Sequence, residues 1–169
     1  MNQTDKDGNL VFLYSTNPTD QYTYIKAAND KGYSVMLMDG PLDAHFVGLL
    51  EQKIEKSRFV RVDSDVIENL IPKADKKVAD LSAEERDMLT TLFNSQIPSI
   101  DKAQFYVSFE SLGENGAPIV ITQNEYMRRM KDMAAMQPGM SFYGDMPDSY
   151  SMTVNVDQPV VAKIAAEAK

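Results

Sequence analysis

The residues best suited to binding chemistry are methionines near the end of the chain. Six of the eleven methionines fall between Met127 and Met146. Methionine is unbranched and polarizable, so an exposed methionine-rich surface adapts to many different apolar partners. Helical spacing puts Tyr126, Met130 and Met133 on one side of a helix. This spacing fits an exposed binding surface, but it also fits a helix that buries the same side in a core.

Residues that could perform acid–base or nucleophilic catalysis do not form a recognisable set. The chain has no cysteine, which excludes disulfides, thiolate catalysis and thiolate metal sites. His45 is the only histidine, and one histidine cannot build a histidine-rich metal site. Asp63 and Asp65 lie two residues apart directly after an expected strand, where acidic loop residues are common. We therefore expect no catalytic residue and no metal site.

Signatures of nucleotide binding are also missing from the sequence. Asp39 follows an expected strand, where dinucleotide-binding folds carry a ribose-binding acid. That reading requires a glycine-rich turn after the first strand, but residues 15–20, STNPTD, contain no glycine. The segment GENGAP, residues 113–118, has neither the spacing nor the lysine of a phosphate-binding loop. We expect no cofactor site in this chain.

The composition is that of a soluble globular protein, with 43% hydrophobic and 25% charged residues. A net charge of −8 argues against nucleic acid as a partner, because phosphate binding requires a basic surface. The polar N-terminus lacks a signal sequence, and apolar runs such as LVFLY are too short to span a bilayer. We expect no membrane contact and a cytoplasmic location.

The first part of the chain alternates between strand and helix patterns. Buried strands are expected at 10–14, 34–38 and 59–62, helices at 21–29 and 43–53, and a helical turn at 66–70. The order β-α-β-α-β predicts parallel strands joined by right-handed crossovers. We expect a small three-layer α/β subdomain over residues 1–75, which ends in the charged segment 73–80, KADKKVAD.

The second part, residues 76–169, predicts an α+β domain with a three-stranded sheet and an exposed amphipathic helix. Ser82 and Glu85 have the spacing of a capping box that opens a helix through residue 97. Strands are expected at 104–111 and 119–122, joined by GENGAP as an antiparallel hairpin. Asn124 is the expected N-cap of the methionine-rich helix. A third strand at 151–156 and a helix that begins at Pro159 complete the domain.

Two long segments carry a resemblance to a known family. The string EYMRRMKDMAAMQPGMSFYGDMPDSY, followed by SMTVNVDQPVVAKIAAEAK, resembles the C-terminal domain of the heat-shock protein 90 family, in particular its bacterial HtpG type. Upstream, KGYSVMLMDGPLDAHFVGLLEQK and SRFVRVDSDVIENLIPK resemble the last α/β part of that family's middle domain. Their order and spacing also match, so the resemblance covers nearly the whole chain.

The resemblance implies an ATP-dependent molecular chaperone that binds non-native client proteins. In that family ATP and Mg²⁺ bind a separate N-terminal domain, and no ATPase residue of the family matches a position here. The resemblance implies that the amphipathic helix contacts clients. The expected client-binding residues are Tyr126, Met127, Met130, Met133 and Ala134.

The resemblance also implies a homodimer of the parent protein through helices after the third strand. The chain ends inside the first of these, so we expect it to be monomeric alone. The residues alone also allow two other classes of protein. One is an unrelated α/β interaction module with a methionine-rich partner-binding helix. The other is a small α/β enzyme, which the missing motifs disfavour.

Overall fold

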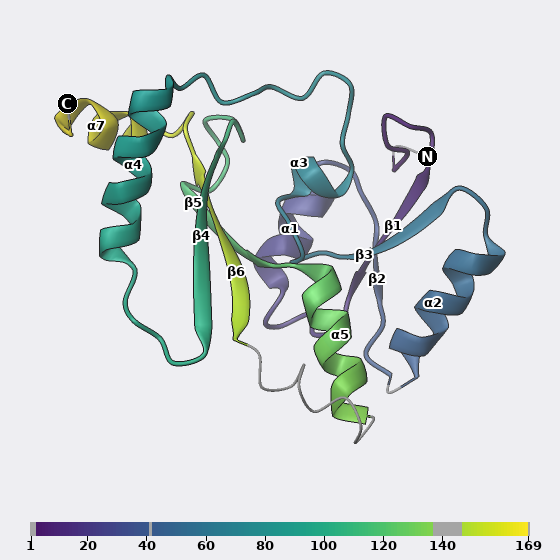
Figure 1. Cartoon of the computed structure of the whole chain (residues 1–169). Helices are drawn as coiled ribbons and strands as arrows, with labels where there is room; N and C mark the ends of the chain where they lie inside the picture. The colour runs from purple at the N-terminus through teal and green to yellow at the C-terminus, as the bar shows by residue number, and fades with distance from the viewer. Residues whose placement is uncertain (1–2, 41, 137–146, 169) are drawn as a thin grey trace. The chain divides into compact units, whose positions relative to one another are not determined.

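The computed structural model describes residues 3–40, 42–136 and 147–168 (Figure 1). For residues 44, 45 and 132–136 it describes the backbone only. The chain divides into two compact units, Met1–Lys76 and Lys77–Lys169. We describe each unit by itself.

The first unit is a three-stranded parallel sheet with helices on both faces, which confirms the predicted β-α-β-α-β order. Its strands are β1 (Leu10–Ser15), β2 (Val35–Leu37) and β3 (Ser57–Arg61), and its helices are α1 (Tyr22–Asp30), α2 (Asp43–Lys53) and α3 (Ile67–Leu70). The strand order is β2-β1-β3, with both outer strands parallel to β1. The chain therefore crosses over from β2 to β3 past the central strand.

Each face of this sheet is packed against different helices. Val11 and Leu13 of β1 belong to a core cluster with Ala28 of α1 and Leu70 of α3. Their neighbours in β1 point to the opposite face, where Tyr14 packs in a cluster with residues of β3 and α2. This alternation produces the three layers.

β2 differs from the expected buried strand. Met36 and Leu37 are 37% and 57% exposed, because β2 is an edge strand that pairs only with β1. The helix that follows is also partly uncovered: Val47 of α2 is buried, but Phe46 and Leu49 are more than half exposed. An apolar run such as SVMLM cannot distinguish a central from an edge strand, because that depends on which strands flank it.

The second unit combines a three-stranded sheet with helices, as predicted for an α+β domain. Its elements are α4 (Ala83–Gln96), β4 (Ala103–Glu110), β5 (Ile119–Gln123), α5 (Glu125–Met136), β6 (Asp148–Asn155) and α7 (Pro159–Glu167). The predicted capping box at the start of α4 is confirmed. Ser82 Oγ accepts a hydrogen bond from Glu85 N at 3.1 Å, and Ser82 N donates to the Glu85 carboxylate at 3.0 Å.

The predicted hairpin of β4 and β5 is wrong. The strand order is β4-β6-β5, with β6 parallel to β4 and antiparallel to β5. The glycine-containing segment is part of an eight-residue connection, residues 111–118, rather than a tight turn. Thr153, Val154 and Asn155 of β6 are all buried, as expected for a central strand. Burial of β6 on both sides therefore determines the strand order.

The core of the second unit lies between this sheet and two helices. Leu89 of α4, Phe109 of β4, Val154 of β6 and Val161 of α7 form one buried cluster. Within the described ranges, we find no helix with the length and apolar character that crossing a membrane requires. The sheet and α4 form the framework from which α5 projects.

Candidate client-binding helix

α5 begins at a side-chain cap. Asn124 Oδ1 accepts hydrogen bonds from the backbone N–H groups of Tyr126 (3.0 Å) and Met127 (3.3 Å). These are two of the N–H groups that a helix start otherwise leaves without partners. The prediction that Asn124 is the N-cap is thereby confirmed.

The charged side chains of α5 attach the helix to its own unit. Glu125 Oε1 accepts hydrogen bonds from Arg128 at 3.0 Å and from Arg129 at 2.7 Å. Lys131 Nζ lies 2.6 Å from a carboxylate oxygen of Asp148, the first residue of β6. The Arg128 side chain is only 12% exposed. Glu125, Arg128 and Lys131 are therefore largely buried although they are charged, with side chains 19%, 12% and 21% exposed.

Tyr126 lies on the other side of the helix. It is 69% exposed, and helical spacing places it and Met130 roughly opposite Arg128. Met127 and Met130 are half-buried. The side chains of Met133 and Ala134 lie outside the described residues, although their backbone is part of α5.

Asp63 belongs to a network of polar side chains at the ends of β1 and β3. It accepts hydrogen bonds from Arg61 Nε and from Gln21 Nε2, the latter at 2.8 Å. Gln21 Oε1 in turn accepts from Ser15 Oγ at 2.8 Å. Burial, with the negative charge of Asp63, raises the pKa of Tyr24. The network ties two loops together and accounts for this acid without a catalytic role.

The other acidic candidates also have local partners or lie apart from a site. Asp65 Oδ1 accepts from Val66 N at 2.7 Å and from Asn69 Nδ2 at 3.0 Å, which fixes the start of α3. Asp39 is exposed after β2, and the side chain of His45 lies outside the described residues. In the described ranges, no three acidic or histidine side chains are grouped as a metal would require.

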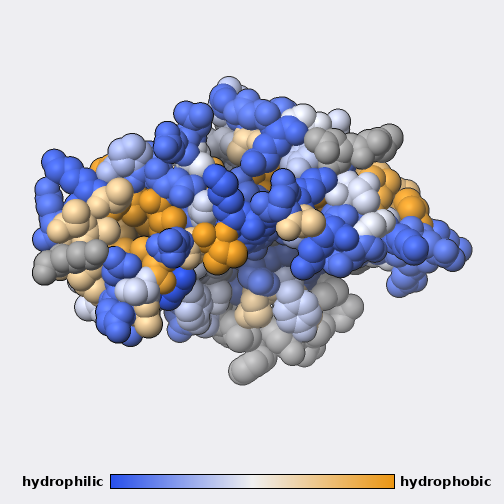
Figure 2. Space-filling view, turned by 90° about the horizontal axis from the view of Figure 1, so that it is seen from above, coloured by the Kyte–Doolittle hydropathy of each residue, from blue (hydrophilic) through white to orange (hydrophobic). Residues whose placement is uncertain are grey.

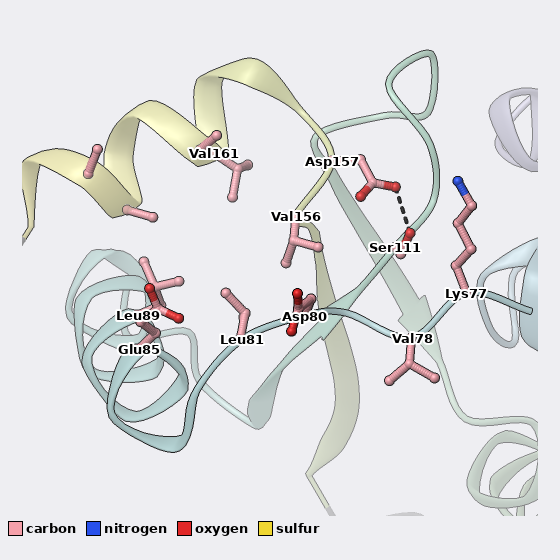
Figure 3. A pocket seen from close by; sticks show the side chains of 13 residues that line it. Lys77, Val78, Asp80, Leu81, Glu85, Leu89, Ser111, Val156, Asp157 and Val161 are labelled. Atoms are coloured by element: carbon pink, nitrogen blue, oxygen red, sulfur yellow. Dashed lines mark hydrogen bonds between the residues drawn. The ribbon is translucent and has the colours of Figure 1, made fainter.

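Sequence reasoning did not predict a groove between α4 and α7. It has a volume of about 610 Å³, and Figure 3 shows Leu81, Leu89, Val156 and Val161 along it. Figure 2 shows hydrophobic surface on the side of the molecule where α4 and α7 lie. The apolar sequence of α7, PVVAKIAAE, is the signal that could have indicated it.

Acidic side chains at the rim of this groove bind their own chain. Glu85 belongs to the capping box. Asp157 accepts hydrogen bonds from Ser111 Oγ and from Gly113 N, both at 2.7 Å (Figure 3). Two of the acidic side chains that line the groove are therefore held by hydrogen bonds within the chain.

Known proteins resemble the chain over nearly its whole length. No family model matches it. The chaperone protein HtpG of Bacteroides thetaiotaomicron is 56% identical over 166 residues, which is 98% of this chain and 24% of that protein. HtpG of Porphyromonas gingivalis is 56% identical over 167 residues, 99% of this chain and 24% of its own length. HtpG of Bacteroides fragilis is 55% identical over 166 residues.

The chain therefore spans about a quarter of the length of the relatives it matches. Identity of 55–56% extends through both structural units, which argues against an unrelated interaction module. The chain belongs to the heat-shock protein 90 family of HtpG chaperones and corresponds to about one quarter of such a protein.

Proposed function

We propose that this chain is a client-contacting part of an ATP-dependent chaperone of the HtpG type. The observation that carries the proposal is the orientation of α5. Its charged side is attached to its own unit through Lys131 and Asp148, while Tyr126 on the other side is 69% exposed. The relatives named as chaperones support the general role.

Charged side chains of α5 are buried more than is usual on a surface helix. An amphipathic helix normally buries its apolar side and exposes its charged side. Here the Arg128 and Glu125 side chains are only 12% and 19% exposed, while Tyr126 is 69% exposed. A non-native protein exposes apolar segments of many shapes, and methionine can adapt to them. The proposed client surface consists of Tyr126, Met127, Met130, Met133 and Ala134.

Further parts of the proposal follow from family membership. Residues 1–75 correspond to the end of the family's middle domain, and residues 76–169 to its C-terminal domain. ATP and Mg²⁺ bind elsewhere in the parent protein, so this chain is not an ATPase. The parent is a cytoplasmic homodimer, and we expect the isolated chain to sediment as a monomer at micromolar concentration.

The test replaces Tyr126, Met130 and Met133 by serine. We expect binding of a reduced, carboxymethylated and permanently unfolded protein to weaken at least about tenfold, a loss of about 1.4 kcal/mol. Fluorescence anisotropy of the labelled client measures this. A matched control replaces Tyr22, Val78 and Val160 by serine; these residues lie elsewhere in the chain and are 63%, 83% and 51% exposed. This control variant should bind the client with the affinity of the wild type.

Two results would contradict the proposal. One is a folded triple variant that binds the client with unchanged affinity. The other is unfolding of the second unit, because buried side chains of this size cost about 2–5 kcal/mol each when truncated. Circular dichroism and thermal melting of both variants separate these cases.

A further inference from the structure

β4 is an edge strand, with β6 as its one neighbour in the sheet (Figure 1). Asp148 N donates to Lys102 O at 2.8 Å, and Val156 N donates to Glu110 O at 3.0 Å. Even-numbered residues of β4 therefore direct their backbone groups toward β6. The N–H and C=O groups of Phe105, Val107 and Phe109 point away from β6, where no strand of the described chain pairs with them.

The sequence and register of β4 lack several of the features that usually prevent strand pairing. Proteins protect edge strands with lysine, proline, bulges or short length. β4 has eight residues, AQFYVSFE, with one charge at its end and no proline. Its register with β6 is regular over the whole strand. Gln104 is exposed and Tyr106 is 58% exposed. The edge therefore presents backbone groups flanked by an aromatic side chain.

We propose that the open edge of β4 takes up an extended segment of a non-native polypeptide as an added strand. The proposal rests on the proposed function for the kind of partner. Its chemistry differs from that of α5, because backbone hydrogen bonds provide the contact and require no particular sequence. Side chains of the added strand alternate between the side of Tyr106 and the side of Phe105 and Val107. Segments with apolar residues at alternate positions fit best.

The size of the edge favours this occupant over a second copy of the chain. Eight residues at about 3.3 Å each give a length of about 26 Å. With a sheet thickness of about 10 Å, the added strand covers about 260 Å² per partner. Stable complexes of two folded proteins bury about 800 Å² per partner. The edge is thus sufficient for a transient contact with a flexible chain and too small for a stable dimer.

Amide hydrogen exchange of the intact 169-residue chain, measured by NMR, tests the proposal. The probe is a nine-residue peptide of alternating valine and threonine with lysine at each end. In the free chain, the amides of Phe105, Val107 and Phe109 exchange faster than those of Gln104, Tyr106 and Ser108. With peptide at about ten times its Kd, exchange at the first three slows about tenfold. The same peptide with N-methyl groups on its internal amides leaves exchange unchanged.

Unchanged exchange at Phe105, Val107 and Phe109 in saturating peptide would overturn the proposal. If exchange at these amides slows with rising chain concentration in the absence of peptide, the edge of β4 pairs with a second copy of the chain instead. The measurement is repeated on the variant with serine at positions 126, 130 and 133. Slowing that persists in this variant shows that the edge binds independently of α5. A failure of α5 to bind clients is therefore distinguishable from a failure of β4 to bind the peptide.

Discussion

Asn155 shows how one buried side chain fixes a connection that the sequence pattern misrepresents. It is fully buried at the end of β6. Its Oδ1 accepts hydrogen bonds from Leu112 N at 3.0 Å and Asp157 N at 3.2 Å, and its Nδ2 donates to Gly113 O at 2.8 Å. The segment after β4 is thus held against the end of the central strand.

Replacing Asn155 by alanine should lower the free energy of unfolding by about 2–3 kcal/mol, because buried backbone groups lose their partners. Urea denaturation followed by circular dichroism measures this. Asn94→Ala is the control, since Asn94 is exposed in α4 and a change there should stay within about 0.5 kcal/mol. Equal stability of the two variants would show that the network contributes little.

Asp5 makes a pH-dependent contribution to the first unit. Burial alone would raise its pKa, but hydrogen bonds from Asn9 and Asp7 and the charge of Arg58 outweigh burial, so the pKa is lowered from 3.8. Because the folded-state pKa is depressed, this stabilisation is present above about pH 4 and disappears as pH falls through the folded-state value. Asp5→Asn should therefore be less stable than the wild type at pH 6, with a smaller difference at pH 3.

Urea denaturation at the two pH values measures this difference. The wild type should lose more stability between pH 6 and pH 3 than Asp5→Asn does. If Asp5→Asn loses as much as the wild type, the hydrogen bonds to Asp5 do not stabilise its charged form.

At the scale of elements, the caps of α4 and α5 offer a matched comparison. Ser82→Ala and Asn124→Ala each remove one side-chain cap, at a cost of about 1 kcal/mol. Only Asn124→Ala should also weaken binding of the unfolded client, because the proposed client surface lies on α5. Thermal melting and anisotropy of both variants provide the readout. Equal client affinity would place the client surface elsewhere.

Features with local causes could be predicted from the sequence, and features with distant causes could not. The capping box Ser82–Glu85 and the cap Asn124 depend on residues within three positions. The partner of β4 lies in β6, more than 30 residues further along the chain, so no local signal indicated it. The position of Tyr126 on α5 followed from helical spacing, but the contact of Lys131 with Asp148 joins residues 17 positions apart and has no local signal.

At the scale of the whole molecule, two separate cores predict two separable folding units. Met1–Lys76 and Lys77–Lys169, of 76 and 93 residues, each contain a buried cluster of their own. Expressed separately, each should unfold cooperatively near its transition temperature in the whole chain. Calorimetry of the pieces and the whole measures this. A piece without a transition would show that its core requires the other unit.

The whole chain should also show no response to ATP and Mg²⁺. A ligand at about 100 times its Kd stabilises a folded protein by about 2.7 kcal/mol, which raises the melting temperature by several degrees. We expect no such shift in thermal melting at millimolar ATP. A saturable shift of several degrees would demonstrate a nucleotide site in this part of the protein.

The central position of β6 has a consequence for synthesis on the ribosome. β4 and β5 leave the ribosome before the strand that joins them, and β4 is complete 45 residues before β6 ends at Asn155. Until then neither strand has its native neighbour, so the apolar side chains of Phe105, Phe109 and Ile121 have no sheet in which to pack. Loops of this length close readily, but the pairing is non-local and slows folding. The nascent second unit therefore exposes the unpaired, aggregation-prone edges of β4 and β5 until its last strand emerges.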